Sequence, residues 1–376
     1  MRSVHHLYPY PPWGWHGGTL RLRTALEASD LIASGTLSWW DRSESCWHEA
    51  SPEIVGSPDP GRLETRHFDD DAGLKRRLFP STLWESGIRP RRAMTPAVEA
   101  HADATLVLHT TYLAPMARTL RRRGWRVVVD VHDAVFRAHR DDARRASGGL
   151  RVVRRSYAAS VKVREAHSLR AADGLAVAGW DDASLLAGLG LTEAVWAPTG
   201  VEADLSPAPP HDRLCVGLIG NFAHSATATA ASEVLRSPLA SDPSVQLLFA
   251  GLGSESWANS RGAIALGPVS RVNEFYDRVH ATVVPVTNGS GMKCKLAEAA
   301  LAGKAVITTP LGAAGYPPSL RAAFVIVERA SLLSSSVVAD AVSRVTPQTL
   351  REQFWPLVGR EAAAATYAEL LRGAAR

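Results

Sequence analysis

The hydrophobic residues of this chain gather in short runs that alternate with amphipathic stretches. In the first half, runs typical of buried strands occupy residues 4–8, 35–40, 104–109, 125–131, 174–178 and 193–197. A helical spacing of apolar residues follows several of them, at residues 19–28, 114–123 and 181–189. Strands that alternate with helices indicate a parallel sheet with helices on both faces.

A stretch rich in proline and acidic residues, PTGVEADLSPAPPHDR at 198–213, interrupts this pattern and is typical of a linker. The alternation then restarts, with strands expected at 214–219, 245–250, 281–286, 305–309 and 323–327. Helices are expected at 227–235, 272–279, 293–302 and along the tail from 347 to 376. The sequence therefore predicts two α/β domains, whose ligands would bind beyond the carboxyl ends of the strands.

Composition narrows the class of protein. The 376 residues are 46% hydrophobic and 21% charged, which is the balance of a globular protein of about two domains. The net charge of +5 favours anionic partners such as phosphates or nucleotides. The three cysteines, Cys46, Cys215 and Cys294, lie too far apart to form a zinc motif or a disulfide framework. With neither a signal peptide nor an apolar run of about 18 residues, the sequence predicts a cytoplasmic protein.

The segment from 288 to 315, NGSGMKCKLAEAALAGKAVITTPLGAAG, carries the strongest chemical pattern. Small residues at 288–291 let backbone N–H groups approach a ligand, and the helix that follows directs its positive N-terminus at the same place. Lys293 would add a full charge for a phosphate. Glu298 lies on an apolar helix, where an unpaired carboxylate is costly, and a ribose diol would supply two donors to it. From the residues alone, a solvated Glu298 beside solvated Lys293 and Lys295 is an equal alternative.

This segment, extended to PVTNGSGMKCKLAEAALAGKAVITTPLGAAGY, resembles the nucleotide-sugar-binding region of the group 1, family 4 type glycosyltransferases of the GT-B fold. The resemblance implies that Glu298 holds the ribose hydroxyls of the donor. Ser290 stands where many members carry a second glutamate that orients the donor sugar. The residues that the resemblance assigns to the donor in this loop are Asn288, Gly289, Ser290, Gly291, Met292 and Lys293.

Two further segments resemble donor-binding loops of the same family. LYPYPPWGWHGGTLRLRTAL, at 7–26, is similar to the first loop, which assigns Gly17, Gly18 and Arg21 to the donor diphosphate or the transferred sugar. GLIGNFAHSATATAASEVL, at 217–235, is similar to a glycine loop that faces the phosphates, here through Gly220 and Asn221. Its glycine spacing does not fit a dinucleotide fingerprint. Many members carry Arg and Lys in that loop, which this chain lacks, so the resemblance leaves the phosphate charge to Lys293 and, as an alternative, Lys295.

The catalytic candidates follow two neighbouring strands of the first domain. His109 ends the strand in LVLHTTYLAPMA, while His132 and Asp133 follow the strand in VVVDVHDAVFRAHR, and both segments resemble the family. Side chains after adjacent parallel strands face a ligand cleft. We expect His132 or Asp133 to accept the proton of an acceptor hydroxyl or to orient the acceptor, with His109 and Asp130 beside them.

The resemblance implies an α/β protein of the GT-B fold, with two Rossmann-like parallel-sheet domains facing across a cleft. The expected domains are 1–198, on the acceptor side, and 199–354, for the nucleotide sugar, with a helix at about 355–376 packing back on the first. The implied function is transfer of a sugar from a nucleotide-diphosphate sugar to an acceptor hydroxyl, with retention, no metal and no other cofactor. The acceptor, a small molecule or a glycan, would meet residues 41–100, where the likeness is weakest. Two alternatives stay open, a sugar-nucleotide 2-epimerase and a non-catalytic nucleotide-sugar-binding subunit.

A basic stretch between 137 and 170 carries ten Lys and Arg residues against three acidic ones. Such a stretch is most often a solvated helix face, and we favour that interpretation. Peripheral contact with an anionic membrane, or with a polyanionic acceptor, is the alternative. No nucleic-acid-binding motif accompanies the charge, so nucleic acid is not an expected partner.

Overall fold

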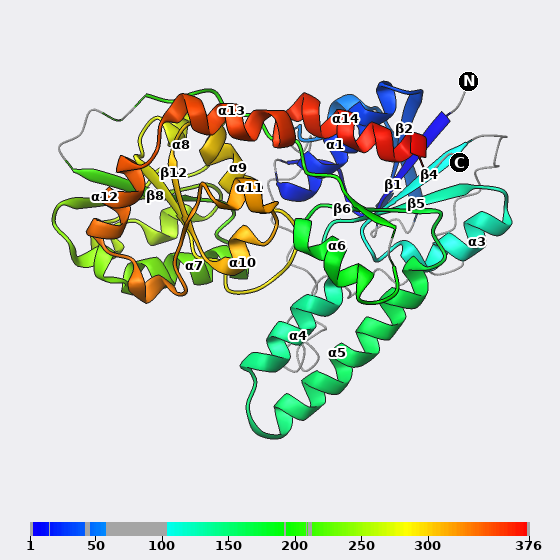
Figure 1. Ribbon diagram of the computed structural model, residues 1–376, viewed down its shortest axis with the longest axis horizontal. Helices are drawn as coiled ribbons and strands as arrows, with labels where there is room; N and C mark the ends of the chain where they lie inside the picture. Colours follow the sequence, from blue (N-terminus) through cyan, green and yellow to red (C-terminus); the bar gives the residue numbers. More distant parts are fainter. Residues whose placement is uncertain are drawn as a thin grey trace. The chain divides into compact units, whose positions relative to one another are not determined.

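The computed structural model describes residues 3–14, 16–41, 46–57, 104–191, 193–207, 209 and 213–373. Its internal contacts divide the chain into two compact units, coloured along the sequence in Figure 1. Unit 1 comprises residues 1–200, 289–291 and 363–376, and unit 2 comprises 201–288 and 292–362. Most of the segment 41–100, where acceptor contacts are expected, lies outside the described residues.

Unit 1 is built on a seven-stranded sheet in the order β3-β2-β1-β4-β5-β6-β7, parallel except for the β2–β3 pair. Its strands are β1 (Ser3–Tyr8), β2 (Ser34–Asp41), β3 (Cys46–Ala50), β4 (Thr105–His109), β5 (Arg126–Val131), β6 (Gly174–Val177) and β7 (Ala194–Trp196). Its helices are α1 (Gly17–Asp30), α3 (Ala117–Arg122), α4 (Val135–Arg145), α5 (Gly148–Leu169) and α6 (Trp180–Ala187), with α14 (Arg360–Gly373) returning from the end of the chain. The antiparallel strand β3 was not expected from the sequence.

Alternating side chains of the central strands pack on opposite faces of this sheet. Val107 and Val128 belong to the core that α1 and α14 cover, together with Tyr367. Their neighbours Leu106 and Val127 belong to the core on the other face. Because both faces are covered, these strands are apolar along their whole length.

Unit 2 has a fully parallel sheet of six strands in the order β10-β9-β8-β11-β12-β13. Its strands are β8 (Leu214–Ile219), β9 (Val245–Ala250), β10 (Ile264–Ala265), β11 (Ala281–Val284), β12 (Ala305–Thr308) and β13 (Val325–Ile326). Its helices are α7 (Ser225–Arg236), α8 (Asn273–Tyr276), α9 (Cys294–Leu301), α10 (Pro310–Ala313), α11 (Pro318–Arg321), α12 (Ser335–Ser343) and α13 (Pro347–Val358). The prediction of two α/β domains with parallel sheets is confirmed.

Each sheet has one point where the order of strands reverses. In unit 1 it lies between β1 and β4, and in unit 2 between β8 and β11. Crevices at such points receive the ligands of open α/β sheets. Among the described residues, no helix is long and apolar enough to cross a membrane.

Gly217, inside β8, tests how closely α8 packs on the sheet of unit 2. A Cβ at this position would lie 2.4 Å from Phe275 Cζ and 2.7 Å from Val279 Cγ1. Gly217→Ala should therefore destabilise the protein by about 1–3 kcal/mol, as overpacking of a core does. Thermal unfolding measures the loss. Gly149→Ala, whose new methyl group would meet nothing within 4 Å, is the control, and equal melting of both variants would contradict this packing.

Candidate functional site

The reversal point of unit 1 holds a buried carboxylate surrounded by cations and imidazoles. Asp130, near the end of β5, is wholly buried, and Arg21 of α1 binds it through Nη2, 2.6 Å from Oδ1, and through Nε, 3.0 Å from Oδ1 and 3.1 Å from Oδ2. Arg21 also donates from Nη1 to the carbonyl oxygen of Ala197, and its guanidinium lies 5.0 Å from the centre of the Tyr367 ring. The ion pair thus joins α1, β5, the segment after β7 and α14.

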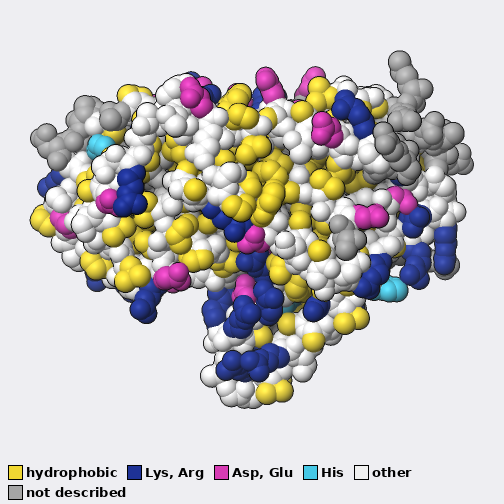
Figure 2. All heavy atoms as spheres, viewed as in Figure 1, with side chains coloured by type: hydrophobic (Ala, Val, Ile, Leu, Met, Phe, Trp, Pro, Cys, Tyr) yellow, Lys and Arg dark blue, Asp and Glu magenta, His cyan; other side chains and the backbone are white. Residues whose placement is uncertain are grey.

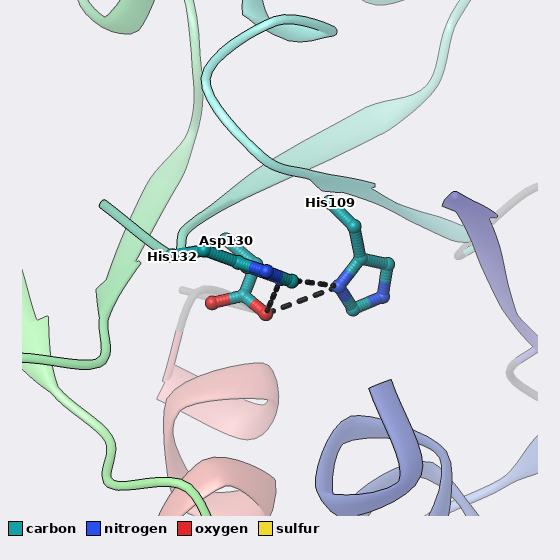
Figure 3. A group of neighbouring side chains, drawn as sticks. All are labelled: His109, Asp130 and His132. Carbon is teal, nitrogen blue, oxygen red and sulfur yellow. Dashed lines mark hydrogen bonds and ion pairs between the residues drawn. The ribbon is translucent and has the colours of Figure 1, made fainter. Parts of the chain in front are cut away.

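Two histidines meet the same carboxylate. His109 Nδ1 lies 3.1 Å from Asp130 Oδ2, and His132 Nε2 lies 3.3 Å from the same oxygen, as Figure 3 shows. The two ring nitrogens are 3.4 Å apart. Burial alone would raise the pKa of Asp130, but Arg21 and the two histidines together outweigh burial, and the pKa lies well below its usual range. The carboxylate is therefore ionised at neutral pH.

A third histidine, His6 of β1, extends the network into the core. His6 Nδ1 lies 3.0 Å from His109 Nε2, and His6 Nε2 lies 2.8 Å from Ser29 Oγ. Burial lowers the pKa of both His6 and His109, so both rings are neutral at pH 7. His6 is not recognisable as part of this network from the sequence, because its partners come from α1 and β4.

His109 Nδ1, Asp130 Oδ2 and His132 Nε2 lie within 4.8 Å of one another, close enough for one metal ion to touch all three. The Arg21 guanidinium already neutralises this carboxylate, however. A divalent cation would place two positive centres against one buried carboxylate, which desolvation makes costly. The donor set therefore fits an ion-pair and hydrogen-bond network better than a resident metal.

Arg21 differs from its expected role at the donor diphosphate. Only 1% of its side chain is exposed, and its guanidinium is committed to Asp130 and Ala197. Gly18 contributes to the packing instead, because a Cβ there would lie 2.8 Å from the hydroxyl of Tyr8. The side chain of His16 accepts hydrogen bonds from the backbone N–H of Gly18, at 3.1 Å, and caps α1, which begins at Gly17. The end of the first loop thus forms the N-terminus of α1, which the side chain of His16 caps.

The catalytic candidates of unit 1 differ in their exposure. His109 is wholly buried, while 13% of the His132 side chain reaches the surface. Asp133, next along the chain, is exposed and lies outside the network of Asp130. Among these three, His132 is both partly accessible and held in orientation, because its Nε2 contacts Asp130. His109 is in contact with His6, Asp130 and His132.

The reversal point of unit 2 brings α9 against the loop after β8. Gly220 follows β8, and a Cβ on it would lie 2.8 Å from Lys295 Nζ, so the ammonium group rests on this loop. Lys295 and Glu298 are three residues apart on α9 and share one face of the helix. The glycine loop has no cation of its own in the sequence, and Lys295, the alternative to Lys293, lies beside it.

Glu298 and Lys295 are partly buried, and both pKa values move toward the neutral form. Burial raises the pKa of Glu298 to about 7, against the opposing effect of Lys295. Burial likewise lowers the pKa of Lys295 to about 8, against the effect of Glu298. The hydroxyl of Tyr276 lies 3.4 Å from Glu298 Oε2 and 3.2 Å from the carbonyl oxygen of Lys295. The carboxylate and the ammonium thus form a poorly solvated pair whose charges a ligand could compensate.

The other donor-binding candidates surround the start of α9. Lys293 is the N-cap residue of this helix, and Tyr316 anchors that end by donating to the Lys293 carbonyl oxygen at 2.8 Å and accepting from Ala297 N at 3.1 Å. Met292 is buried. In the glycine loop, Gly289 and Gly291 have positive φ. Asn288 is partly buried and Ser290 is buried, with residues 289–291 grouped in unit 1.

Asn221 has a local role in the loop after β8. Its side-chain oxygen accepts a hydrogen bond from Ala223 N at 3.0 Å, which shapes the turn into α7. Gly251, at φ +111°, lets β9 end against this loop, since a Cβ there would lie 2.0 Å from the Gly220 carbonyl oxygen. The loop is therefore fixed by backbone packing, with Lys295 as its cation.

Comparison with known proteins defines the class. Residues 213–342 match the family model of the glycosyl transferases group 1, and the two parallel-sheet units have the GT-B fold. The match covers about a third of the chain, so it is this region that is similar to the group 1 glycosyltransferases; together with the GT-B fold it supports a nucleotide-sugar-dependent glycosyltransferase. The comparison with curated protein sequences gives no match.

Solved structures resemble the chain along nearly its whole length. Sucrose-phosphate synthase from Thermosynechococcus elongatus has a TM-score of 0.68 at 14% identity, with 99% of both chains covered. HepE from Anabaena, in complex with UDP and glucose, has a TM-score of 0.62 at 11% identity, covering 99% of this chain and 100% of that one. The trehalose-6-phosphate synthase OtsA has a TM-score of 0.59 at 12% identity, covering 99% and 98%. At such identities the likeness establishes the fold alone.

The buried neutral histidines predict acid sensitivity. An unfolded histidine binds a proton below a pH of about 6.5, whereas native His6 and His109 do not, so stability should fall as the pH drops below that value. Each group contributes a slope of at most about 1.4 kcal/mol per pH unit. His6→Gln should flatten the dependence of the unfolding free energy on pH between about 6.5 and 4. Denaturant titrations measure it, with exposed His167→Gln as the control, and an unchanged slope in His6→Gln would contradict a neutral His6.

Proposed function

We propose that the chain transfers a glycosyl group from a nucleoside diphosphate sugar to an acceptor hydroxyl, with retention at the anomeric carbon and without a metal ion at the diphosphate. The observation that carries the proposal is the pair Lys295–Glu298 at the reversal point of unit 2. Both groups lose solvation there, and each matches one part of a nucleotide. HepE, a protein with the same fold, was solved with UDP and glucose, so UDP is the first nucleotide to test.

Glu298 is proposed to bind the ribose. Its carboxylate offers two oxygens, and the two hydroxyls of a ribose would donate to them and replace lost water. Such donors favour the ionised form and would lower the pKa of Glu298 from about 7. Tyr276, beneath the carboxylate, limits its movement.

Lys295 is proposed to bind the diphosphate, aided by Lys293 at the start of α9. The ammonium lies on Gly220, where the absence of a side chain lets phosphate oxygens approach the backbone. A phosphate would favour the charged form of Lys295 and raise its pKa from about 8. Two lysines and a helix N-terminus can then stabilise the charge that develops on the leaving group.

The proposed transfer requires no protein group as a base. The acceptor oxygen bonds to the anomeric carbon while the bond from that carbon to the phosphate oxygen breaks. The proton of the acceptor hydroxyl passes to the leaving phosphate oxygen on the same face, which retains the configuration. We propose that His132, held by Asp130, orients a substrate hydroxyl, and that His109 is a positioning residue behind it.

Calorimetric titration with UDP tests the donor site. Glu298→Gln and Lys295→Met should each weaken UDP binding by about 10- to 100-fold, as expected for the loss of a charged hydrogen bond. The advantage of the wild type over Glu298→Gln should narrow below pH 7, because Glu298 must first lose a proton there. Affinities unchanged in both variants would overturn the assignment.

Exposed residues of unit 2 provide the matched controls. Glu328→Gln and Arg236→Met remove the same charges from the surface and should leave UDP affinity unchanged. NMR of the donor sugar nucleotide, with and without acceptors, then identifies the reaction. A 2-epimer formed from the donor alone would favour the epimerase, and UDP binding with no turnover across an acceptor panel would favour a non-catalytic binding subunit.

A further inference from the structure

The two helices α4 and α5 form a hairpin that projects from the sheet of unit 1 (Figure 1). Helix α5 has 22 residues and is therefore about 33 Å long. One side of α5 is buried, through Ala158, Val161, Glu165 and Leu169. The opposite side is exposed along most of the helix.

The charge on α5 is almost entirely positive. It carries five Lys and Arg residues and one acidic residue, Glu165. Glu165 is buried and used within the hairpin, because its oxygens accept hydrogen bonds from the backbone N–H of Val135, at 3.1 Å, and Phe136, at 2.9 Å, at the start of α4. The exposed face of α5 therefore presents cations and no carboxylate.

The acidic residues of α4 do not balance this charge. Asp141 pairs with Arg140 and Arg144, and Asp142 pairs with Arg145, all on α4 itself. Within the described part of the chain, Arg151, Arg155 and Lys162 of α5 make no ion pair of this kind. Figure 2 shows the Lys and Arg side chains gathered over the hairpin, with hydrophobic side chains among them.

The same face carries apolar residues at helical spacing. Val152 and Val163 are 65% and 69% exposed, and they lie eleven positions apart, which is close to three full turns of the helix. Ser156 and Ala159 lie between them on one stripe, with Arg155 and Lys162 along its side. An apolar stripe beside basic residues is the pattern of helices that lie in the interface of a bilayer.

We propose that this outward face of α5 binds the surface of an anionic phospholipid bilayer. Val152 and Val163 enter the boundary between headgroups and acyl chains. Arg155 and Lys162 meet the lipid phosphates. A polyanion such as RNA or an acidic glycan would match the charge but would leave the exposed valines without a partner, so the bilayer accounts for more of the surface. The inference does not depend on the proposed nucleotide site.

Sedimentation of the full chain with vesicles tests the proposal. The protein should bind vesicles of phosphatidylcholine and phosphatidylglycerol in equal parts and should not bind phosphatidylcholine alone. Added salt should weaken the binding, because counterions screen the charges. Equal binding to both kinds of vesicle, or no binding to either, would overturn the proposal.

Two double variants separate charge from apolar contact. Arg155→Gln with Lys162→Gln should weaken binding to the anionic vesicles roughly 30-fold, from the loss of two basic residues at the surface. Val152→Ser with Val163→Ser should weaken it about tenfold through lost apolar burial. Since these side chains are exposed, melting temperatures should not change.

Matched changes on unit 2 are the controls. Arg236→Gln with Arg278→Gln, and Ile264→Ser with Leu332→Ser, alter exposed residues of the same kinds and should preserve vesicle binding. If the valine variant bound as the wild type does, the apolar insertion would be wrong. If RNA or heparin bound tightly while vesicles did not, the surface would serve a polyanion instead.

Discussion

The fold of unit 1 depends on one buried charge, the carboxylate of Asp130. Removing such a group from water is costly, and it persists only because Arg21 and two imidazoles surround it. Arg21 reaches it from α1 and also binds Ala197, close to the point where unit 1 ends. The requirement to compensate one carboxylate therefore fixes α1, β4, β5 and the segment after β7 at the same end of the sheet, and it orients His132 there.

The two reversal points differ in how far protein groups compensate their buried charges. In unit 1 the cation and imidazoles around Asp130 keep its carboxylate ionised, while burial lowers the pKa of His109 and keeps its ring neutral. In unit 2, burial moves Glu298 and Lys295 toward their neutral forms, although they lie one helical turn apart. A site whose charges are not fully compensated by protein groups gains most from a ligand that supplies donors and phosphate oxygens. For this reason we propose that the nucleotide binds to unit 2.

Much of this could be read from the sequence, and the rest depends on contacts between distant segments. The alternation of strands and helices predicted two parallel sheets, because burial on both faces imposes apolar strands. The segment at 285–316 predicts a role for Glu298 from sequence alone, since the spacing along one helix is local information. It does not show that Lys295 lies beside Gly220, because that contact joins segments far apart in the sequence. Nor does the sequence show the ion pair of Arg21, because its partner, Asp130, lies 109 residues away. The positive charge of α5 can be read from the basic stretch. The burial of Glu165 and the exposure of Val152 and Val163 depend on how α4 and α5 pack, which the sequence does not show.

A crystal structure of the chain with UDP bound would test the central claim most directly. We expect both ribose hydroxyls to lie within hydrogen-bond distance of the Glu298 carboxylate, about 2.5–3.0 Å. We also expect a phosphate oxygen within about 2.7–3.2 Å of Lys295 Nζ, over Gly220. A nucleotide bound elsewhere, or one whose ribose faces away from Glu298, would contradict this claim.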